Sequence, residues 1–191
     1  KLHRTSKKIK LFRKNSMSIN SLDPLLKSIK FKSKNISPNL QSVLTQSLNK
    51  IKKDWPKKLP KGIIHGDLFI DNIFFKKNKF AGFIDFYFSC TDYFMYELAI
   101  CVNALCFDKK NNKFIINNKK IKSLIKGYES VKKISLKEKN SLNILCRGAA
   151  LRYLLTRVYD YFNTPKNALI KIKDPKEYFQ KLIIHNNLNS Y

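Results

Sequence analysis

Residues 65–85 constrain the fold of this chain more than any other segment. His65-Gly66-Asp67 is followed five positions later by Asn72, and then by two apolar, aromatic-rich runs that flank Lys77-Asn78 and end at Asp85. Two such runs around a short polar turn predict a β-hairpin. Because a hairpin returns the chain beside its start, we expect the second aspartate to lie next to the asparagine.

These polar groups stand in the order that phosphoryl transfer from ATP requires. Asp67 could accept the proton of an acceptor hydroxyl, while Asn72 and Asp85 could bind Mg²⁺ on the ATP phosphates. Mg²⁺ needs only one or two protein oxygens besides phosphate and water. The D-x-x-x-x-N spacing alone is common in loops, but Gly66, the hairpin and the second aspartate together favour a kinase. Asp71 is interpreted as a solvated or loop-bracing carboxylate.

The segment 62–108 resembles the catalytic core of the homoserine kinases of the aminoglycoside phosphotransferase-like and choline kinase-like family, the ThrB type. The resemblance rests on three runs, which are Ile84-Asp85-Phe86-Tyr87 in place of the Asp-Phe-Gly of protein kinases, Phe88-Ser89-Cys90, and Leu98-Ala99-Ile100-Cys101-Val102-Asn103. Outside the core, residues 151–157 and 172–178 resemble the last two helices of that family, and residues 1–4 resemble the helix after its interlobe hinge. The resemblance therefore covers nearly the whole chain.

The resemblance implies transfer of the ATP γ-phosphate to the side-chain hydroxyl of L-homoserine, a step of threonine biosynthesis. It also implies an N-terminal nucleotide lobe with a β-sheet, a phosphate-covering loop and an ATP-contacting lysine, and nothing here precedes Lys1. The five glycines are scattered, so they form no glycine-rich phosphate loop. We therefore expect a truncated, C-terminal lobe that is inactive or nearly so by itself.

The expected fold is an α+β, protein kinase-like C-terminal lobe, mostly helical around one hairpin. With 191 residues and 43% hydrophobic residues, the chain can bury one core, so we expect a single lobe over 1–191. Within it, 62–108 carries the catalytic loop and metal hairpin, and 119–191 the C-terminal helices. Further expected elements are helices from Ser37 to Asp54, after Asp92, from Ser135 to Phe162 behind a capping box, and after Asp174, and a loop from Lys109 to Lys120.

A net charge of +26 would ordinarily suggest nucleic acid as a partner. However, 34 of the 39 basic residues are lysines spread over every polar segment, as expected of an A/T-rich coding bias. A nucleic-acid binder should cluster basic residues with stacking aromatics. We therefore expect no specific nucleic-acid partner. The segment 62–106 differs from the rest, because five carboxylates outnumber three lysines there, which suits Mg²⁺.

The remaining composition suggests a cytoplasmic protein. The longest apolar stretch, Phe94 to Phe107, is interrupted by polar residues and too short to span a bilayer. Cysteines 90, 101, 106 and 146 show no C-x-x-C spacing and are expected to be reduced core thiols.

Arginine is rare in this chain, and three of its five copies fall at 147, 152 and 157. Steps of five turn about 140° round a helix, so the three cannot all face one site. Arg152 is our first choice for a contact to the substrate carboxylate and Arg157 our second. A structural ion pair with a neighbouring acid is an equally open role for either.

Four other residues are assigned to the site. His65 is expected to order the catalytic loop by hydrogen bonding. Glu97 stands where this fold usually has an aspartate that braces the loop. Tyr87 and Asp92 follow the metal aspartate, where an acceptor should bind, and Asp92 could pair with a substrate ammonium or cap a helix.

Two other functions remain open. A kinase of the same fold could phosphorylate choline, methylthioribose or an aminoglycoside, although choline would want an aromatic cage and Trp55 lies in a linker far from the catalytic loop in sequence. Alternatively, the chain could be a non-catalytic, kinase-like binding module.

Overall fold

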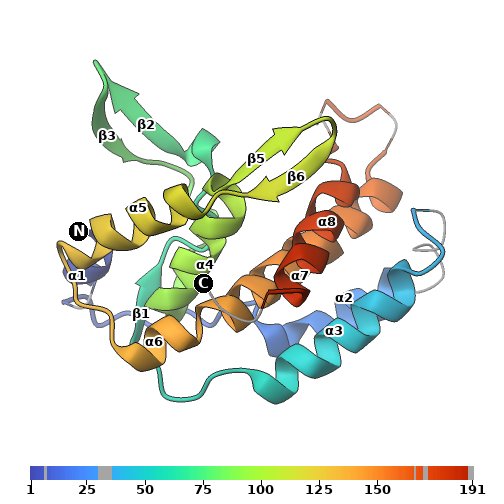
Figure 1. Ribbon diagram of the computed structural model, residues 1–191, viewed down its shortest axis with the longest axis horizontal. Coiled ribbons are helices and arrows are strands. Elements are labelled where there is room, and N and C mark those ends of the chain that lie inside the picture. Colours follow the sequence, from blue (N-terminus) through green and yellow to red (C-terminus); the bar gives the residue numbers. More distant parts are fainter. Residues whose placement is uncertain (7, 30–35, 166, 170–171, 189–191) are drawn as a thin grey trace.

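A computed structural model describes residues 1–6, 8–29, 36–165, 167–169 and 172–188 (Figure 1). The expected C-terminal region 119–191 includes 166, 170–171 and 189–191, which lie outside the described residues. The architecture is α+β, and the described residues form a mostly helical body with three two-stranded sheets. The helices are α1 (Leu2–Ser6), α2 (Leu22–Ile29), α3 (Leu40–Asp54), α4 (Phe94–Leu105), α5 (Asn118–Glu129), α6 (Leu136–Asn140), α7 (Leu142–Asn163) and α8 (Pro175–Asn186). The strands are β1 (Lys61–Ile64), β2 (Ile73–Lys76), β3 (Lys79–Phe83), β4 (Cys90–Tyr93), β5 (Phe107–Lys110) and β6 (Lys113–Ile116).

Helix α7 forms the centre of the core and packs against α8, α4, α2 and α3. Small residues in its middle allow close approach, since a Cβ on Gly148 would lie 2.3 Å from Cζ3 of Trp55. The Trp55 ring, just after α3, also meets Tyr96 edge-on at 5.7 Å. The tryptophan assigned to a linker is thus part of the packing on α7.

Helix α4 accounts for the longest apolar stretch, and its residues from Phe94 to Asn103 are all buried. Cys101 lies in this helix, and the other three cysteines are also buried, all four as free thiols. Among the described helices, none combines the length and the apolarity needed to cross a bilayer.

The predicted hairpin is confirmed. Strands β2 and β3 pair antiparallel, with Ile73 opposite Phe83. Lys77 and Asn78 both have positive φ, 48° and 59°, which is the backbone of a tight two-residue turn. Beyond the strands, the amide of Ile84 donates to the carbonyl of Asn72 at 3.2 Å. This bond holds the segment before Asp85 beside Asn72, on a hairpin that projects from the helical body (Figure 1).

The expectation of one hairpin was wrong. The segment predicted as a loop, 109–120, contains most of a second hairpin, β5–β6, and the start of α5. Its turn is Asn111-Asn112, with φ of 49° and 59°, a conformation that asparagine tolerates better than most residues. A third sheet pairs β1 with β4 antiparallel, so that Gly62 faces Asp92.

Two helix starts were predicted correctly and two helix predictions need correction. The capping box of Ser135 and Glu138 opens α6, and the Asp174 carboxylate caps α8 by accepting from the amide of Lys176 at 2.8 Å. The single helix expected from Ser135 to Phe162 is divided at Ser141 into α6 and α7. Asp92 does not cap α4, because it belongs to β4 and Tyr93 occupies the cap position.

Candidate active site

The catalytic loop between β1 and β2 is held by one buried carboxylate. Glu97, on α4, is 2% exposed and accepts hydrogen bonds from the backbone amides of His65 and Gly66, the second at 3.2 and 3.3 Å to its two oxygens. A carboxylate that accepts backbone N–H bonds inside a protein forms strong, charge-assisted bonds. The single Glu97 side chain therefore reaches both amides.

Two further features define the path of the loop. Gly66 has φ of +78°, and a Cβ there would lie 2.6 Å from the carbonyl oxygen of Phe88, so only glycine fits without distortion. His65 is fully buried, and its Nε2 bonds to the carbonyl of Ile84 at 2.8 Å while its Nδ1 accepts from the amide of Asp67 at 3.3 Å. These roles require the neutral ring with its proton on Nε2. His65 thus links the catalytic loop to the segment that leads into Asp85.

Asp67 is oriented by helix α7. The Tyr153 hydroxyl lies 3.0 Å from Oδ1 of Asp67 and 3.2 Å from the carbonyl of Gly66, which also accepts from Nη1 of Arg152 at 2.8 Å. Burial raises the pKa of Asp67, and the Tyr153 hydrogen bond and the Arg152 charge oppose part of that rise. A raised carboxyl pKa makes the carboxylate a better proton acceptor.

Asn72 and Asp85 are the residues whose side-chain oxygens could bind a metal ion. Nδ2 of Asn72 donates to the carbonyl of Asp67 at 2.8 Å. Oδ1 of the same amide takes no part in this bond. Asp85 is exposed in a left-handed conformation (φ 59°, ψ 64°), and its Oδ1 accepts from the amide of Tyr87 at 3.4 Å. One amide oxygen and one carboxylate are hard oxygen donors of the kind that suit Mg²⁺.

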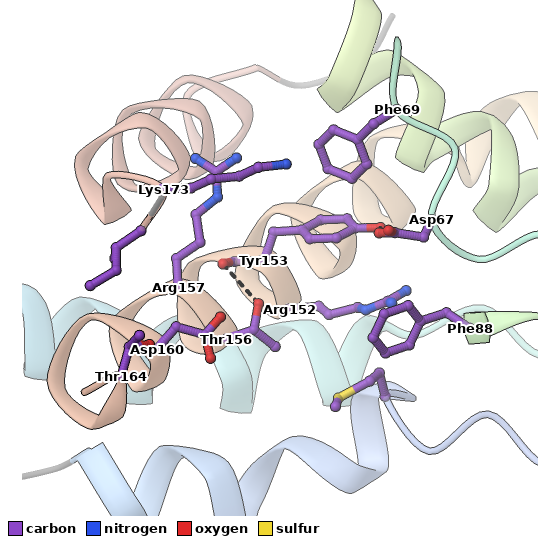
Figure 2. A pocket seen from close by; sticks show the side chains of 12 residues that line it. Asp67, Phe69, Phe88, Arg152, Tyr153, Thr156, Arg157, Asp160, Thr164 and Lys173 are labelled. Atoms are coloured by element: carbon purple, nitrogen blue, oxygen red, sulfur yellow. Dashed lines mark hydrogen bonds between the residues drawn. The ribbon is translucent and has the colours of Figure 1, made fainter. Parts of the chain in front are cut away.

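A pocket of about 380 Å³ opens beside Asp67 (Figure 2). One wall is aromatic, from Phe69 and Phe88, and the floor is a face of α7. The α7 residues in the lining recur at spacings of three and four, which places them on one side of the helix. They are Arg152, Tyr153, Thr156, Arg157 and Asp160, with Thr164 just beyond the helix, and Met17, Ile172 and Lys173 complete the lining.

The three arginines of α7 do not share one site, as predicted. Arg147 donates to three carbonyls at the end of α8 and beyond it. Arg152 is 3% exposed, with its guanidinium 5.5 Å from the ring of Phe88 and 4.8 Å from that of Tyr153. Arg157 lines the same pocket as Arg152, but its Nη1 pairs with Glu177 at 2.7 Å.

Tyr87 and Asp92 lie away from this pocket. The Tyr87 side chain is 70% exposed, and its carbonyl accepts from Nη1 of Arg13 at 2.8 Å. Asp92 accepts from Nδ2 of Asn15 at 2.6 Å and lines a second cavity of about 340 Å³ that also contains Trp55. The N-terminal segment, not the pocket at Asp67, therefore contacts both positions.

Sequence reasoning missed the pocket residues other than Asp67 and the two arginines. Tyr153 contacts Asp67 across 86 positions of sequence, and no local motif marks such a contact. A usable signal was the spacing of Tyr153, Thr156 and Asp160, which places them on the same helix face as Arg157.

The model of the phosphotransferase enzyme family matches residues 2–115, more than half of the chain. This chain belongs to the phosphotransferase enzyme family. The match includes the loop with Asp67 and Asn72 and the whole metal-binding candidate hairpin, whereas α7 lies outside it.

Curated relatives of this phosphotransferase include three homoserine kinases. The chain is 41% identical to that of Methylobacterium radiotolerans over 184 residues, which cover 96% of this chain and 56% of that protein. It is 39% identical to the homoserine kinase of Sinorhizobium medicae over 189 residues, which cover 99% of this chain and 57% of that protein. It is 42% identical to the homoserine kinase of Rhodospirillum rubrum over 173 residues, which cover 91% of this chain and 53% of that protein. The phosphotransferase chain thus spans about half the length of the curated relatives it matches.

Proposed function

We propose that this phosphotransferase is a homoserine kinase and that the chain is its protein kinase-like C-terminal lobe. It would transfer the ATP γ-phosphate to the hydroxyl of L-homoserine in threonine biosynthesis, in the cytoplasm. The observation that carries the proposal is the half-buried Asp67, which accepts a hydrogen bond from Tyr153 in the lining of a pocket. The names of the relatives supply the acceptor.

In the proposed mechanism, Asp67 accepts the proton of the acceptor hydroxyl as the phosphoryl group is transferred in line. Asn72 and Asp85 would hold Mg²⁺, which would neutralise charge on the ATP phosphates. His65 and Glu97 keep the loop in place, because between them they bond to every backbone amide from 65 to 67.

Arg152 is the proposed contact for the α-carboxylate of the substrate, with Arg157 second. Nε of Arg152 is buried and has no hydrogen-bond partner among the described residues, which favours a ligand acceptor there. The existing pair of Arg157 with Glu177 makes it the weaker candidate. Tyr87 and Asp92 are kept as secondary substrate candidates, since both follow Asp85 in the chain.

We further propose that an N-terminal nucleotide lobe completes the ATP site, so that the 191-residue chain alone should be inactive or nearly so. ATP turnover by the isolated chain would contradict this. The sequence encoded upstream of Lys1 gives a second test, because it should contain a glycine-bearing strand-loop-strand followed by a strand lysine. Without those features, the non-catalytic binding module would be favoured.

The test of the assignment is Asp67→Asn in the full-length protein, measured as kcat for L-homoserine with ATP and Mg²⁺. We expect a loss of at least a hundredfold, within the range that general-base catalysis contributes. Asp54→Asn is the matched control, since Asp54 is exposed at the end of α3, outside the pocket lining. Near-wild-type turnover of Asp67→Asn would show that the base is misassigned. A screen of choline, methylthioribose and an aminoglycoside as acceptors tests the substrate separately.

A further inference from the structure

Asp160 is an exposed carboxylate that lines the pocket from α7. Its side chain makes neither a hydrogen bond nor an ion pair with any residue that the structure describes. It lines the pocket beside Asp67, and Figure 2 shows it across the pocket from Asp67, next to Thr164. An acid without a partner, in a chain of net charge +26, is therefore available to a cationic ligand.

The positively charged side chains that line the pocket interact with groups other than Asp160. Arg152 donates to the carbonyl of Gly66, and Arg157 pairs with Glu177. Lys173 lies 3.6 Å from Asp71. Partial burial raises the pKa of Asp160, and no neighbouring positive charge lowers it. The pocket thus contains a negative group that its own lining does not neutralise.

The rise along α7 from Tyr153 to Asp160 is comparable to the length of an amino-acid acceptor. Asp160 lies seven residues after Tyr153, which orients Asp67, and seven residues correspond to about 10 Å of helix axis. Extended homoserine places its ammonium nitrogen roughly 5 Å from its hydroxyl oxygen, from ordinary bond lengths. A hydrogen bond of about 2.8 Å at each end brings the span to about 10 Å.

We propose that Asp160 binds the α-ammonium group of the acceptor, so that the pocket selects an amino acid over the hydroxy acid that lacks the amine. This inference rests on the proposed homoserine kinase function, and it assigns the α-carboxylate to Arg157, the second candidate, because the carboxylate shares a carbon atom with the amine and Arg152 lies at the Asp67 end of the pocket. An acceptor without the amine leaves Asp160 unpaired and brings its own carboxylate toward a like charge. A charge-assisted hydrogen bond corresponds to a preference of roughly tenfold to a hundredfold.

The experiment compares L-homoserine with 4-hydroxybutyrate, which lacks only the α-amino group. Binding of each to the full-length protein is measured by NMR titration, which tolerates millimolar affinities. We expect the wild-type chain to bind L-homoserine at least tenfold more tightly. Asp160→Asn should lose most of this preference through weaker L-homoserine binding, without weaker binding of 4-hydroxybutyrate. Asp54→Asn, which removes the same charge from α3, should behave as wild type.

The outcomes separate the inference from the proposed function. If Asp160→Asn binds L-homoserine with the wild-type preference, Asp160 does not contact the ammonium, and the homoserine kinase proposal is unaffected. If the variant loses both ligands equally, its role is structural, and the inference is overturned. If the full-length wild-type protein binds neither compound, the acceptor pocket itself is wrong, and both proposals fail.

Discussion

His185 on α8 makes the stability of this chain sensitive to acid. The ring is fully buried, its Nε2 lies 3.0 Å from Oδ1 of Asn103, and the ring of Phe107 meets it edge-on at 5.4 Å. Burial, and then the charges of Lys181 and Arg147, lower the pKa of His185 from 6.5 to about 3. In the unfolded chain the same side chain titrates near its ordinary value of about 6.5.

The sign and size of the effect follow from linkage. Below pH 6.5 the unfolded chain takes up a proton that folded His185 does not, so stability falls as the pH drops from about 6.5 toward 3. Between pH 7 and pH 5 the loss is about 2 kcal/mol, at roughly 1.4 kcal/mol per unit. For a chain of this length, that corresponds to a decrease in Tm of about 4–8 °C.

The test measures the free energy of unfolding in urea at pH 7 and pH 5, followed by circular dichroism, for wild type and His185→Gln. The glutamine amide can still donate to Asn103 but does not titrate. We expect wild type to lose about 2 kcal/mol more than the variant over this interval, because every other titrating group is common to both. Equal losses in the two proteins would refute the assignment of the acid sensitivity to His185.

Three further predictions concern the catalytic loop. In the full-length protein, Tyr153→Phe removes a hydrogen bond that lowers the Asp67 pKa. The acid limb of kcat/KM should therefore move to higher pH by roughly one to two units, and an unmoved limb would contradict the contact. Gly66→Ala should lower the unfolding free energy of the chain by about 2 kcal/mol, against little change for Gly82→Ala, where a Cβ meets nothing within 4 Å. Glu97→Ala should cost about 3 kcal/mol or more by chemical denaturation, because two buried backbone amides lose their acceptor, and a cost below 1 kcal/mol would exclude the proposed brace.

Local sequence predicted the elements whose causes are local. The β2–β3 hairpin follows from apolar runs around Lys77-Asn78, and the starts of α6 and α8 follow from capping residues within three positions. The same turn chemistry should have identified β5–β6, because Asn111-Asn112 adopts the same left-handed turn. The polar composition of its flanks obscured that hairpin, since only one side of it is partly buried.

Contacts between segments that lie far apart in the sequence could not be predicted from local sequence patterns. Asp92 looked like a helix cap because it stands two residues before α4, but pairing of β4 with β1 and a bond from Asn15, 77 positions earlier, place it in a strand. The pocket beside Asp67 has the same origin, since its floor on α7 lies more than 80 positions from the candidate catalytic loop.

Helix α7 connects the candidate catalytic base with the acceptor pocket. Tyr153 orients Asp67, Arg152 bonds to the carbonyl before it, and Asp160 lies two turns further along the same helix. Most of this helix is buried against α4 and α8, so its axial spacing cannot adapt as a loop could. The distance from the base to the far end of the pocket is therefore set by helix geometry. An acceptor one methylene shorter or longer than homoserine would displace its hydroxyl by more than 1 Å if its amine were held at Asp160. A misplacement of that size is enough to lower the rate of transfer by about a hundredfold.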